Sequence, residues 1–460
     1  MDVVCSDNDP RSTGASLIAV AAGPGARELG APERASADAA PVAIVYGEPS
    51  IAVIAVGSGA DGLRAAAARA VRASGPGESV AWALDPAAAP AVEQVRALAE
   101  GAVIGAYDAR GGADADDRRF VICGAGATAL ADAAAPAARV ARWCNVAREL
   151  VDGPSNVITP AELARRAGAI PGVEAEIVDP AAAGLRALAA VGGSSPSPPR
   201  LIVLRHRPPE APATPRLALV GKGVTFDTGG YFLKSKPDIV AQKADMAGGA
   251  AVLAALGAIA ELQLPLVVTG VVPACENLLS ATALRPTDVI TTASGVSVEV
   301  VNPDAEGRLI LADALWYARR EGATHLVDLA TLTGGVPDAL GDVHAGVFGT
   351  DEAWRDAVAD AGNAAGDPAW PLPLHDRYER WLASEVADLR NVAGRPLGFS
   401  IFAATFLARF AGDGPWAHVD MLGTALARED RGDAFGAGAT GYGVRMLVEL
   451  ARRLAAETRA

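Results

Sequence analysis

The sequence predicts an α/β protein built of two domains. Short apolar stretches alternate with alanine-rich helical stretches along the chain, a pattern typical of helices packed on a largely parallel sheet. With 460 residues, of which 51% are hydrophobic and 20% are charged, the chain can fill large cores but is too long for one ordinary domain. We therefore expect an amino-terminal α/β domain over residues 1–137, a linker helix over 138–153, and a larger α/β domain over 154–460 with a mixed, mostly parallel sheet.

The amino-terminal domain is predicted from three short apolar stretches that are typical of strands. They span residues 42–46, 51–56 and 120–124, and a helix is expected from Gly62 onward. Between residues 138 and 151 the apolar residues then fall on one helical stripe, which stops at Asp152-Gly153-Pro154. This stripe predicts the helix that bridges the two domains.

The larger domain is predicted from strands at 201–204, 217–220, 266–272 and 325–330 and from an apolar helix at 248–262. Continuous apolar runs of this kind suit strands that are covered on both faces. Lys222 and Asp227 follow one of these strands, and Thr331 follows another. Because ligand sites in open α/β sheets form at the carboxyl ends of strands, a site is expected at that edge of the sheet.

The composition excludes several classes of protein. A net charge of −14 argues against nucleic-acid binding, which needs a cationic surface. The four cysteines lack the spacing of a zinc ribbon or a disulfide framework. The first residues lack the segments of a signal peptide, and no apolar run free of charges, Gly and Pro is long enough to span a bilayer. We expect a cytoplasmic protein with no nucleic-acid partner and no membrane partner.

The octapeptide over residues 302–309 carries the strongest chemical signal. Its Asp304 and Glu306 are separated by one residue, so an extended segment points both carboxylates to the same side. A bare Asp-x-Glu is commonly an exposed acidic turn. Here apolar runs flank the pair on both sides, and buried carboxylates need partners. Together with Asp227 and Asp245 upstream, the pair predicts a site for two metal ions, and the metal suggests a hydrolase.

Lys222 has two possible roles. It could form an ordinary ion pair with Asp227, which would contribute little to stability, or its amine could be a metal ligand. Two nearby dications would favour the neutral amine and lower the pKa of Lys222. Oxygen-rich ligation with one amine suits Zn²⁺ or Mn²⁺ without choosing between them. None of the five histidines lies in a His-Glu-x-x-His motif, which excludes the one-zinc protease built on that helix.

Residues 302–309 resemble the Asn-Thr-Asp-Ala-Glu-Gly-Arg-Leu signature of the leucine aminopeptidase (cytosol aminopeptidase) family, with Pro303 in place of the threonine. Other stretches follow in family order: 221–230, 233–234, 245–246, 331–334, 415–420 and 438–445. The resemblance covers the chain from about residue 140 to its end. It implies a catalytic domain over 154–460 behind a macro-like amino-terminal α/β domain.

The resemblance implies a dinuclear metallo-exopeptidase with two divalent ions (Mn²⁺ or Zn²⁺) per subunit. A water that bridges the two ions would cleave the amino-terminal residue from peptides with a free amino terminus. The implied metal ligands are Lys222, Asp227, Asp245, Asp304 and Glu306. Asp227 and Glu306 would bridge both ions, Lys222 and Asp245 would complete one site, and Asp304 would complete the other.

The remaining functional residues are also implied by the resemblance. Lys234 and Arg308 would be the catalytic pair, with a bicarbonate ion at Arg308 as general base. The implied substrate-binding residues are Asn302, Thr331, Leu332, Gly334 and Gln242. Gln242 stands where the family usually has a methionine, so we expect an altered or broadened side-chain preference.

The family assembles as homohexamers, and the same is expected here. Two alternatives stay open. One is a catalytically weak scaffold or binding homologue of the same fold. The other is a nucleotide loop at Gly221-Lys222-Gly223, which lacks the spacing of a phosphate-binding loop.

Overall fold

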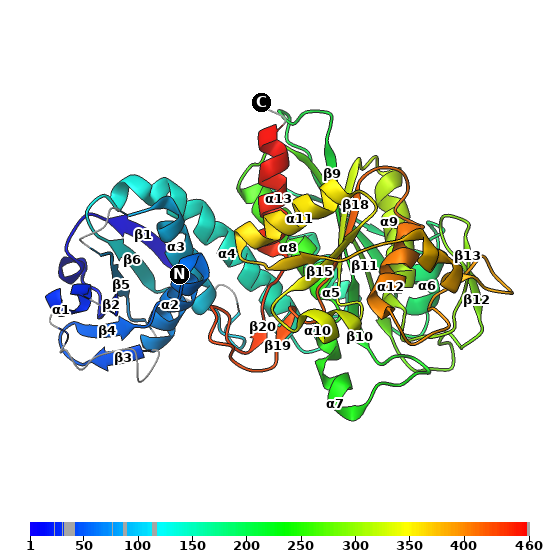
Figure 1. The fold of residues 1–460 in the computed structure, drawn as a ribbon, viewed down its shortest axis with the longest axis horizontal. Coiled ribbons are helices and arrows are strands. Elements are labelled where there is room, and N and C mark those ends of the chain that lie inside the picture. The colour runs from blue at the N-terminus through cyan, green and yellow to red at the C-terminus, as the bar shows by residue number, and fades with distance from the viewer. Residues whose placement is uncertain are drawn as a thin grey trace. The chain divides into compact units, whose positions relative to one another are not determined.

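The computed structural model describes residues 1–22, 24–29, 31, 42–75, 77–85, 90–112 and 117–457 (Figure 1). The chain forms two compact units: Met1–Glu149 with Ala427–Gly438, and Leu150–Leu426 with Ala439–Ala460. Each unit is built of helices and a sheet, which confirms the predicted α/β fold class. The predicted domain boundaries stay predictions.

The first unit contains a six-stranded sheet in the order β1-β6-β5-β2-β4-β3. Neighbouring strands are parallel except for the antiparallel pair β3 and β4. The predicted strands in this region are confirmed as β3, β4 and β6. The strands are β1 (Asp2–Ser6), β2 (Leu17–Ala21), β3 (Val42–Val45), β4 (Ser50–Ile54), β5 (Val80–Ala83) and β6 (Arg119–Cys123).

Helices α2 and α3 of this unit pack closely because two glycines of α3 face α2. A Cβ added at Gly101 or Gly105 of α3 would lie 2.2 or 2.5 Å from the backbone of α2, so the two helices touch backbone to backbone. The helices are η1 (Pro10–Thr13), α1 (Pro24–Glu28), α2 (Gly59–Ala73), α3 (Val92–Gly105), η2 (Thr128–Leu130) and α4 (Ala131–Asp152).

Helix α4 covers residues 138–152 of the predicted linker helix over 138–153, but it begins earlier, at Ala131, and includes Pro136. The segment before residue 138 is rich in alanine, which has the highest helix propensity. Pro136 lies beyond the first turn, so it costs the helix one backbone hydrogen bond, and the surrounding alanines offset part of that cost.

The second unit contains a nine-stranded sheet in the order β16-β15-β18-β14-β9-β11-β8-β7, with β10 paired to β11. The pairs β15–β18, β11–β8 and β7–β8 are antiparallel and the others are parallel. This confirms the mixed, mostly parallel sheet. The strands are β7 (Glu174–Val178), β8 (Arg200–His206), β9 (Arg216–Gly221), β10 (Gly223–Asp227), β11 (Val267–Asn277), β14 (His325–Ala330), β15 (Ala345–Gly349), β16 (Ala369–Pro371) and β18 (Trp416–Asp420).

The remaining strands form two small sheets. They consist of β12 (Val289–Thr291), β13 (Ser297–Glu299) and β17 (Leu389–Arg390), and of β19 (Leu426–Ala427) and β20 (Gly438–Ala439).

Helices cover the large sheet on both faces. Side chains of α6, α9 and α12 join one buried cluster with Ala218 and Val220 of β9, while α8 packs on β9, β11 and α13. The helices are α5 (Pro160–Ala167), α6 (Arg186–Gly192), α7 (Lys236–Ile239), η3 (Val240–Ala244), α8 (Ala247–Glu261), α9 (Gly307–Arg320), α10 (Gly335–Leu340), α11 (Glu352–Ala365), η4 (Asp376–Leu382), α12 (Phe399–Ala408) and α13 (Val444–Glu457).

The stretch Lys236–Glu261 is the one helical stretch in the described ranges that is long and apolar enough to cross a membrane. The sequence was expected to contain no such stretch, because glycines and charges interrupt it. In the structure 94% of the most apolar segment of this stretch is buried. Helix α8 therefore lies in the interior of the second unit.

Candidate metal centre

Four residues of the centre lie where the parallel strands and one helix meet. Lys222 joins β9 to β10, and Asp227 is the last residue of β10. Asp245 follows η3, and Glu306 directly precedes α9. The carboxyl ends of β9, β10 and β14 all face this point, as expected for a parallel sheet.

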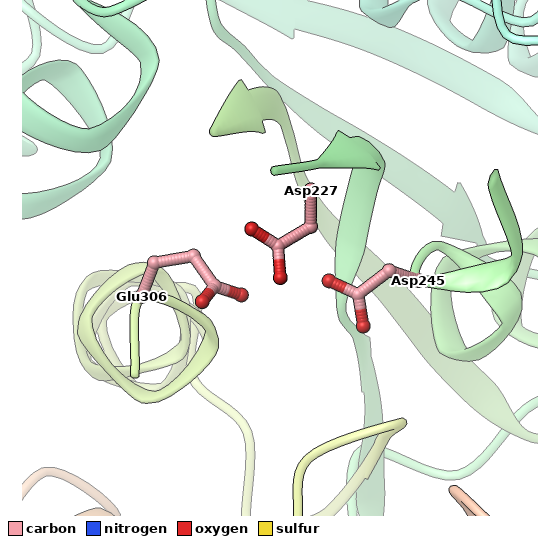
Figure 2. A group of neighbouring side chains, drawn as sticks. All are labelled: Asp227, Asp245 and Glu306. Carbon is pink, nitrogen blue, oxygen red and sulfur yellow. The ribbon is translucent and has the colours of Figure 1, made fainter. Parts of the chain in front are cut away.

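Three carboxylates converge there. One oxygen each of Asp227, Asp245 and Glu306 lies within 4.8 Å of the other two, and Figure 2 shows the three carboxylate groups turned toward one another. Their exposed fractions are 1%, 5% and 1%. Like charges this close and this well buried are unfavourable without cations among them.

Lys222 supplies one of those cations. Its Nζ lies 2.7 Å from Asp245 Oδ1 and 2.8 Å from Glu306 Oε1, and it donates to the carbonyl of Thr331 at 3.2 Å. Burial opposes its charge, but the carboxylates around it raise the pKa of Lys222 above its usual value. Its backbone is fixed as well, because its carbonyl accepts from Gly249 in the first turn of α8 at 2.7 Å.

Lys234 supplies the second cation and links Asp304 to the cluster. Its Nζ lies 2.7 Å from Asp227 Oδ2 and also pairs with Asp304 Oδ1. Burial opposes this charge too, but the carboxylates, Asp227 foremost, raise the pKa of Lys234. Asp304 is more exposed than the three carboxylates of the cluster, with 29% of its side chain accessible.

The carboxylates titrate unequally. Burial raises the pKa of Asp245 to about 6, against the opposing effect of Lys222. Burial and the charge of Glu306 raise the pKa of Asp227 well above its usual value. Burial also acts on Glu306, but Lys222 and Lys234 outweigh it and hold the pKa of Glu306 below its usual value.

The donor set fits divalent metal ions. Asp245 Oδ2 is buried, and no residue in the described ranges hydrogen-bonds to it, so this oxygen is available as a ligand. Carboxylate oxygens and one amine suit Mn²⁺ or Zn²⁺. Asp227, Asp245 and Glu306 converge, and Lys222 Nζ lies against Asp245 and Glu306. Asp304 lies beside Asp227 through their shared contact with Lys234.

Arg308 lies in the first turn of α9 and is 2% exposed. Its Nη1 donates to the carbonyl of Asn391 at 2.6 Å, while its Nε has no hydrogen-bond partner within the described part of the chain. Burial lowers the pKa of Arg308 to about 10. The side chain lines a narrow pocket with Val392, Ala393, Arg395, Phe399 and Phe402.

The predicted substrate-binding residues lie on three segments. Asn302 Oδ1 accepts from the backbone N–H of Asp304 at 2.8 Å, and the Thr331 hydroxyl donates to Asp245 Oδ1 at 2.8 Å. The Leu332 backbone N–H donates to Asp420 at 3.2 Å. Gly334 is exposed directly before α10.

Gln242 lies on η3, three residues before Asp245. Its side-chain nitrogen donates to the carbonyl of Asp238 in the preceding helix α7 at 3.1 Å.

Three buried residues that hold the centre in place were missed from the sequence. Asn277 donates to Asp227 Oδ1 at 2.8 Å and to the carbonyl of Pro303 at 3.2 Å. Asp420 accepts from the Leu332 N–H and the Thr333 hydroxyl. The side chain of Asn391 forms hydrogen bonds with the backbone of Val301, Asn302 and Ala305.

A sequence signal existed for two of these residues. Asn277 and Asp420 are the last residues of β11 and β18, so each is a polar residue at the carboxyl end of an apolar strand. Asn391 follows the two-residue strand β17, which is too short to be recognised from sequence.

Comparisons with known proteins place this geometry in a family context. A family model described as "Cytosol aminopeptidase family, catalytic domain" matches residues 145–448. A probable cytosol aminopeptidase of Solibacter usitatus is 44% identical over 365 residues, covering 77% of this chain and 75% of that protein. One of Roseiflexus castenholzii is 43% identical over 371 residues, covering 77% of this chain and 76% of that protein.

Solved structures are similar over nearly the whole chain. The bottromycin maturation enzyme BotP in complex with Mn is 35% identical with a TM-score of 0.86, covering 96% of this chain and 100% of that chain. A mutant of tomato leucine aminopeptidase is 30% identical with a TM-score of 0.86, covering 98% of this chain and 96% of that chain.

Proposed function

The chain belongs to the cytosol aminopeptidase family and is a peptidase, and from this premise we propose that it removes amino-terminal residues at a centre of two divalent ions. The observation that carries the proposal is the buried cluster of Asp227, Asp245 and Glu306, with an available oxygen on Asp245. BotP, which is similar over nearly the whole chain, was solved with Mn, and this supports Mn²⁺ as one suitable ion.

The proposed ligands divide between two positions. Lys222 and Asp245 complete one position and Asp304 completes the other, while Asp227 and Glu306 serve both. The contact of Lys222 Nζ with Asp245 and Glu306 supports its place in the first group. The contact of Lys234 with both Asp227 and Asp304 supports the second position beside the first.

When bound, the two ions would supply Lewis acidity and a water activated for attack at neutral pH. Lys234 would donate hydrogen bonds to the carbonyl oxygen of the scissile bond as negative charge develops there. Its Nζ already lies at the cluster, paired with Asp227 and Asp304, and it would yield these oxygens to the ions while staying beside them. Arg308 would hold a bicarbonate ion as base through its buried, unused Nε donor.

The substrate is proposed to be a peptide with a free amino terminus. Its amine would bind on the side of Lys222 and Asp245, so a blocked amine would lose this contact. Backbone groups of Thr331, Leu332 and Gly334 would position the peptide, and Asn302 would hold the ligand segment beside it. Gln242 supports an altered or broadened preference for the first side chain, because it is a polar amide.

The protein is further proposed to be cytoplasmic, which the names of its relatives support, and to have no nucleic-acid partner, which its net charge of −14 supports. A homohexamer without a membrane partner is proposed from the family resemblance alone. A catalytically weak scaffold of the same fold is the less favoured candidate, because all the proposed ligands and both catalytic residues are present.

The test is hydrolysis of chromogenic amides of several amino acids, with amino-acetylated amides as blocked controls. We expect a chelator to abolish the activity and Mn²⁺ or Zn²⁺ to restore it, while blocked amides remain intact. Lys234→Ala should lower kcat about 10²–10³-fold, as the loss of one donor to a developing oxyanion does. Full activity in Asp304→Ala would reject the proposed centre. Much faster hydrolysis of the leucine amide than of every polar amide would reject the altered preference.

A further inference from the structure

Asn391 is fully buried, and its side chain binds the segment that carries the proposed ligands. Its Oδ1 accepts from the backbone N–H of Val301 at 2.8 Å and of Asn302 at 3.2 Å. Its Nδ2 donates to the carbonyl of Asn302 at 2.7 Å and of Ala305 at 3.4 Å. Two lone pairs and two N–H groups are the full capacity of an asparagine side chain, and all four act on this one segment.

The backbone of Asn391 is fixed on both sides. Its N–H donates to the carbonyl of Glu299 at 3.0 Å, which continues the parallel pairing of β13 with β17. Its carbonyl accepts from Arg308 Nη1 at 2.6 Å. Asn391 therefore contacts both the segment that precedes Glu306 and the guanidinium of Arg308, which follows Glu306 in the sequence.

The segment between β13 and α9 depends on these contacts. Residues 300–306 belong to neither a strand nor a helix, and they are buried or half-buried. Buried backbone outside regular structure must find its hydrogen bonds elsewhere. The chain of contacts continues to the ligands, because Asn302 Oδ1 accepts from the N–H of Asp304 at 2.8 Å and Ala305 directly precedes Glu306.

We propose that Asn391 is a positioning residue of the metal centre. It holds the segment that places Asp304 and Glu306 as ligands, and it holds Arg308 beside them. The inference rests on the proposed function, because it assigns to Asn391 the orientation of groups that bind the two ions. Residues that orient metal ligands commonly change metal affinity or activity about 10–100-fold when they are replaced.

A purely structural role would give a different result, and Asp313 supplies the comparison. It is also fully buried, and it accepts from the backbone N–H groups of Ala187, Leu188 and Ala293 at 2.9, 3.1 and 2.7 Å. None of these residues belongs to the centre. Asp313→Asn keeps one accepting oxygen and replaces the other with an NH2 group. It therefore breaks at least one buried hydrogen bond to a backbone N–H without touching the ligand segment.

The experiment measures Mn²⁺ affinity by calorimetry on the full chain and, separately, the thermal unfolding of each variant. Asn391→Leu keeps the branched shape and the number of heavy atoms of the side chain and removes all four hydrogen bonds. Asn391→Asp keeps both accepted bonds and loses both donated ones, so it serves if the leucine variant does not fold. The added charge alone would strengthen Mn²⁺ binding, whereas loss of positioning weakens it.

We expect both Asn391 variants to bind Mn²⁺ about 10–100-fold more weakly than the wild type, with kcat reduced more than KM is changed. Asp313→Asn should lose thermal stability and keep its Mn²⁺ affinity. Folded Asn391 variants with wild-type or higher Mn²⁺ affinity would overturn the inference and leave the proposed function intact. A wild-type chain that binds no Mn²⁺ and no Zn²⁺ would overturn the proposed function, and the inference with it.

Discussion

At the scale of single residues, the central feature is Lys222 among three buried carboxylates. Its charge is favoured in the metal-free protein, because Asp245 and Glu306 raise its pKa despite burial. An amine can bind a metal ion only after it has lost its proton. Metal binding and protonation therefore compete at this residue.

We predict that metal binding releases about one proton or more per chain near neutral pH. The sign follows from the raised pKa of Lys222: lower pH favours the ammonium, so the apparent Mn²⁺ affinity should fall as pH falls. Calorimetry in two buffers of different ionisation enthalpy measures the released protons. A proton count near zero and an affinity independent of pH would show that Lys222 keeps its proton and is not a ligand.

The sequence predicted the buried carboxylates that the structure brings together better than the residues that support them. Asp304 and Glu306 could be identified because two carboxylates inside an apolar run require partners. Asn391 could not, because its contacts at residues 301–305 are distant in sequence and a lone asparagine carries no signal in composition or spacing.

At the scale of secondary-structure elements, the close contact between α8 and the sheet positions Asp245. Gly248 lies in the first turn of α8, and a Cβ added there would lie 2.1 Å from the carbonyl oxygen of Leu329 in β14. No side chain fits at that distance, so the start of α8 depends on glycine. Asp245 lies three residues earlier and would move with this turn.

We predict that Gly248→Ala lowers the free energy of unfolding by about 1–3 kcal/mol, as overpacking in a well-packed interior does. It should also weaken Mn²⁺ binding, because the helix start must shift. Gly168→Ala is the control, since a Cβ there would meet only ordinary contacts at 3.6 Å. Thermal unfolding and calorimetry compare the two variants. Equal stability and equal Mn²⁺ affinity in both would contradict the role given to Gly248.

The helices and strands that the sequence predicted in the second unit are those with long apolar runs. The strands β8, β9 and β14 and the helix α8 formed close to their expected ranges. Strand β11 begins near its expected start but continues to Asn277, beyond the expected end at residue 272. The short strands β12, β13 and β17 have two or three residues each, too few for a periodic pattern to appear. These are the strands that fix Asn391 beside the ligand segment, so the supporting structure of the centre was not predictable from local sequence.

At the scale of the whole molecule, the residues that make up each of the two units were only partly predictable. Residues 427–438 belong to the first unit although they follow most of the second in sequence. Within that unit, Arg72 contacts the carbonyl of Ala434, and Arg148 donates to the carbonyl of Phe435 at 2.8 Å. Contacts between residues this far apart in sequence leave no pattern in a single chain.

The proposed homohexamer gives a prediction at the same scale. Light scattering coupled to size exclusion should report six times the mass of the chain, unchanged over a broad range of protein concentration if the assembly is stable. The Asp304→Ala variant serves as control and should keep the same mass, because its change lies within the proposed centre. A monomeric mass with full aminopeptidase activity would reject the hexamer and leave the chemistry in place.

The most direct test of the dinuclear centre is a crystal structure of the protein grown with Mn²⁺, with data collected to reveal the anomalous scattering of manganese. We predict two peaks about 3.5–4 Å apart, one beside Lys222 and Asp245 and the other beside Asp304, with Asp227 and Glu306 between them. A single peak, or peaks away from these side chains while the crystals retain aminopeptidase activity, would contradict it.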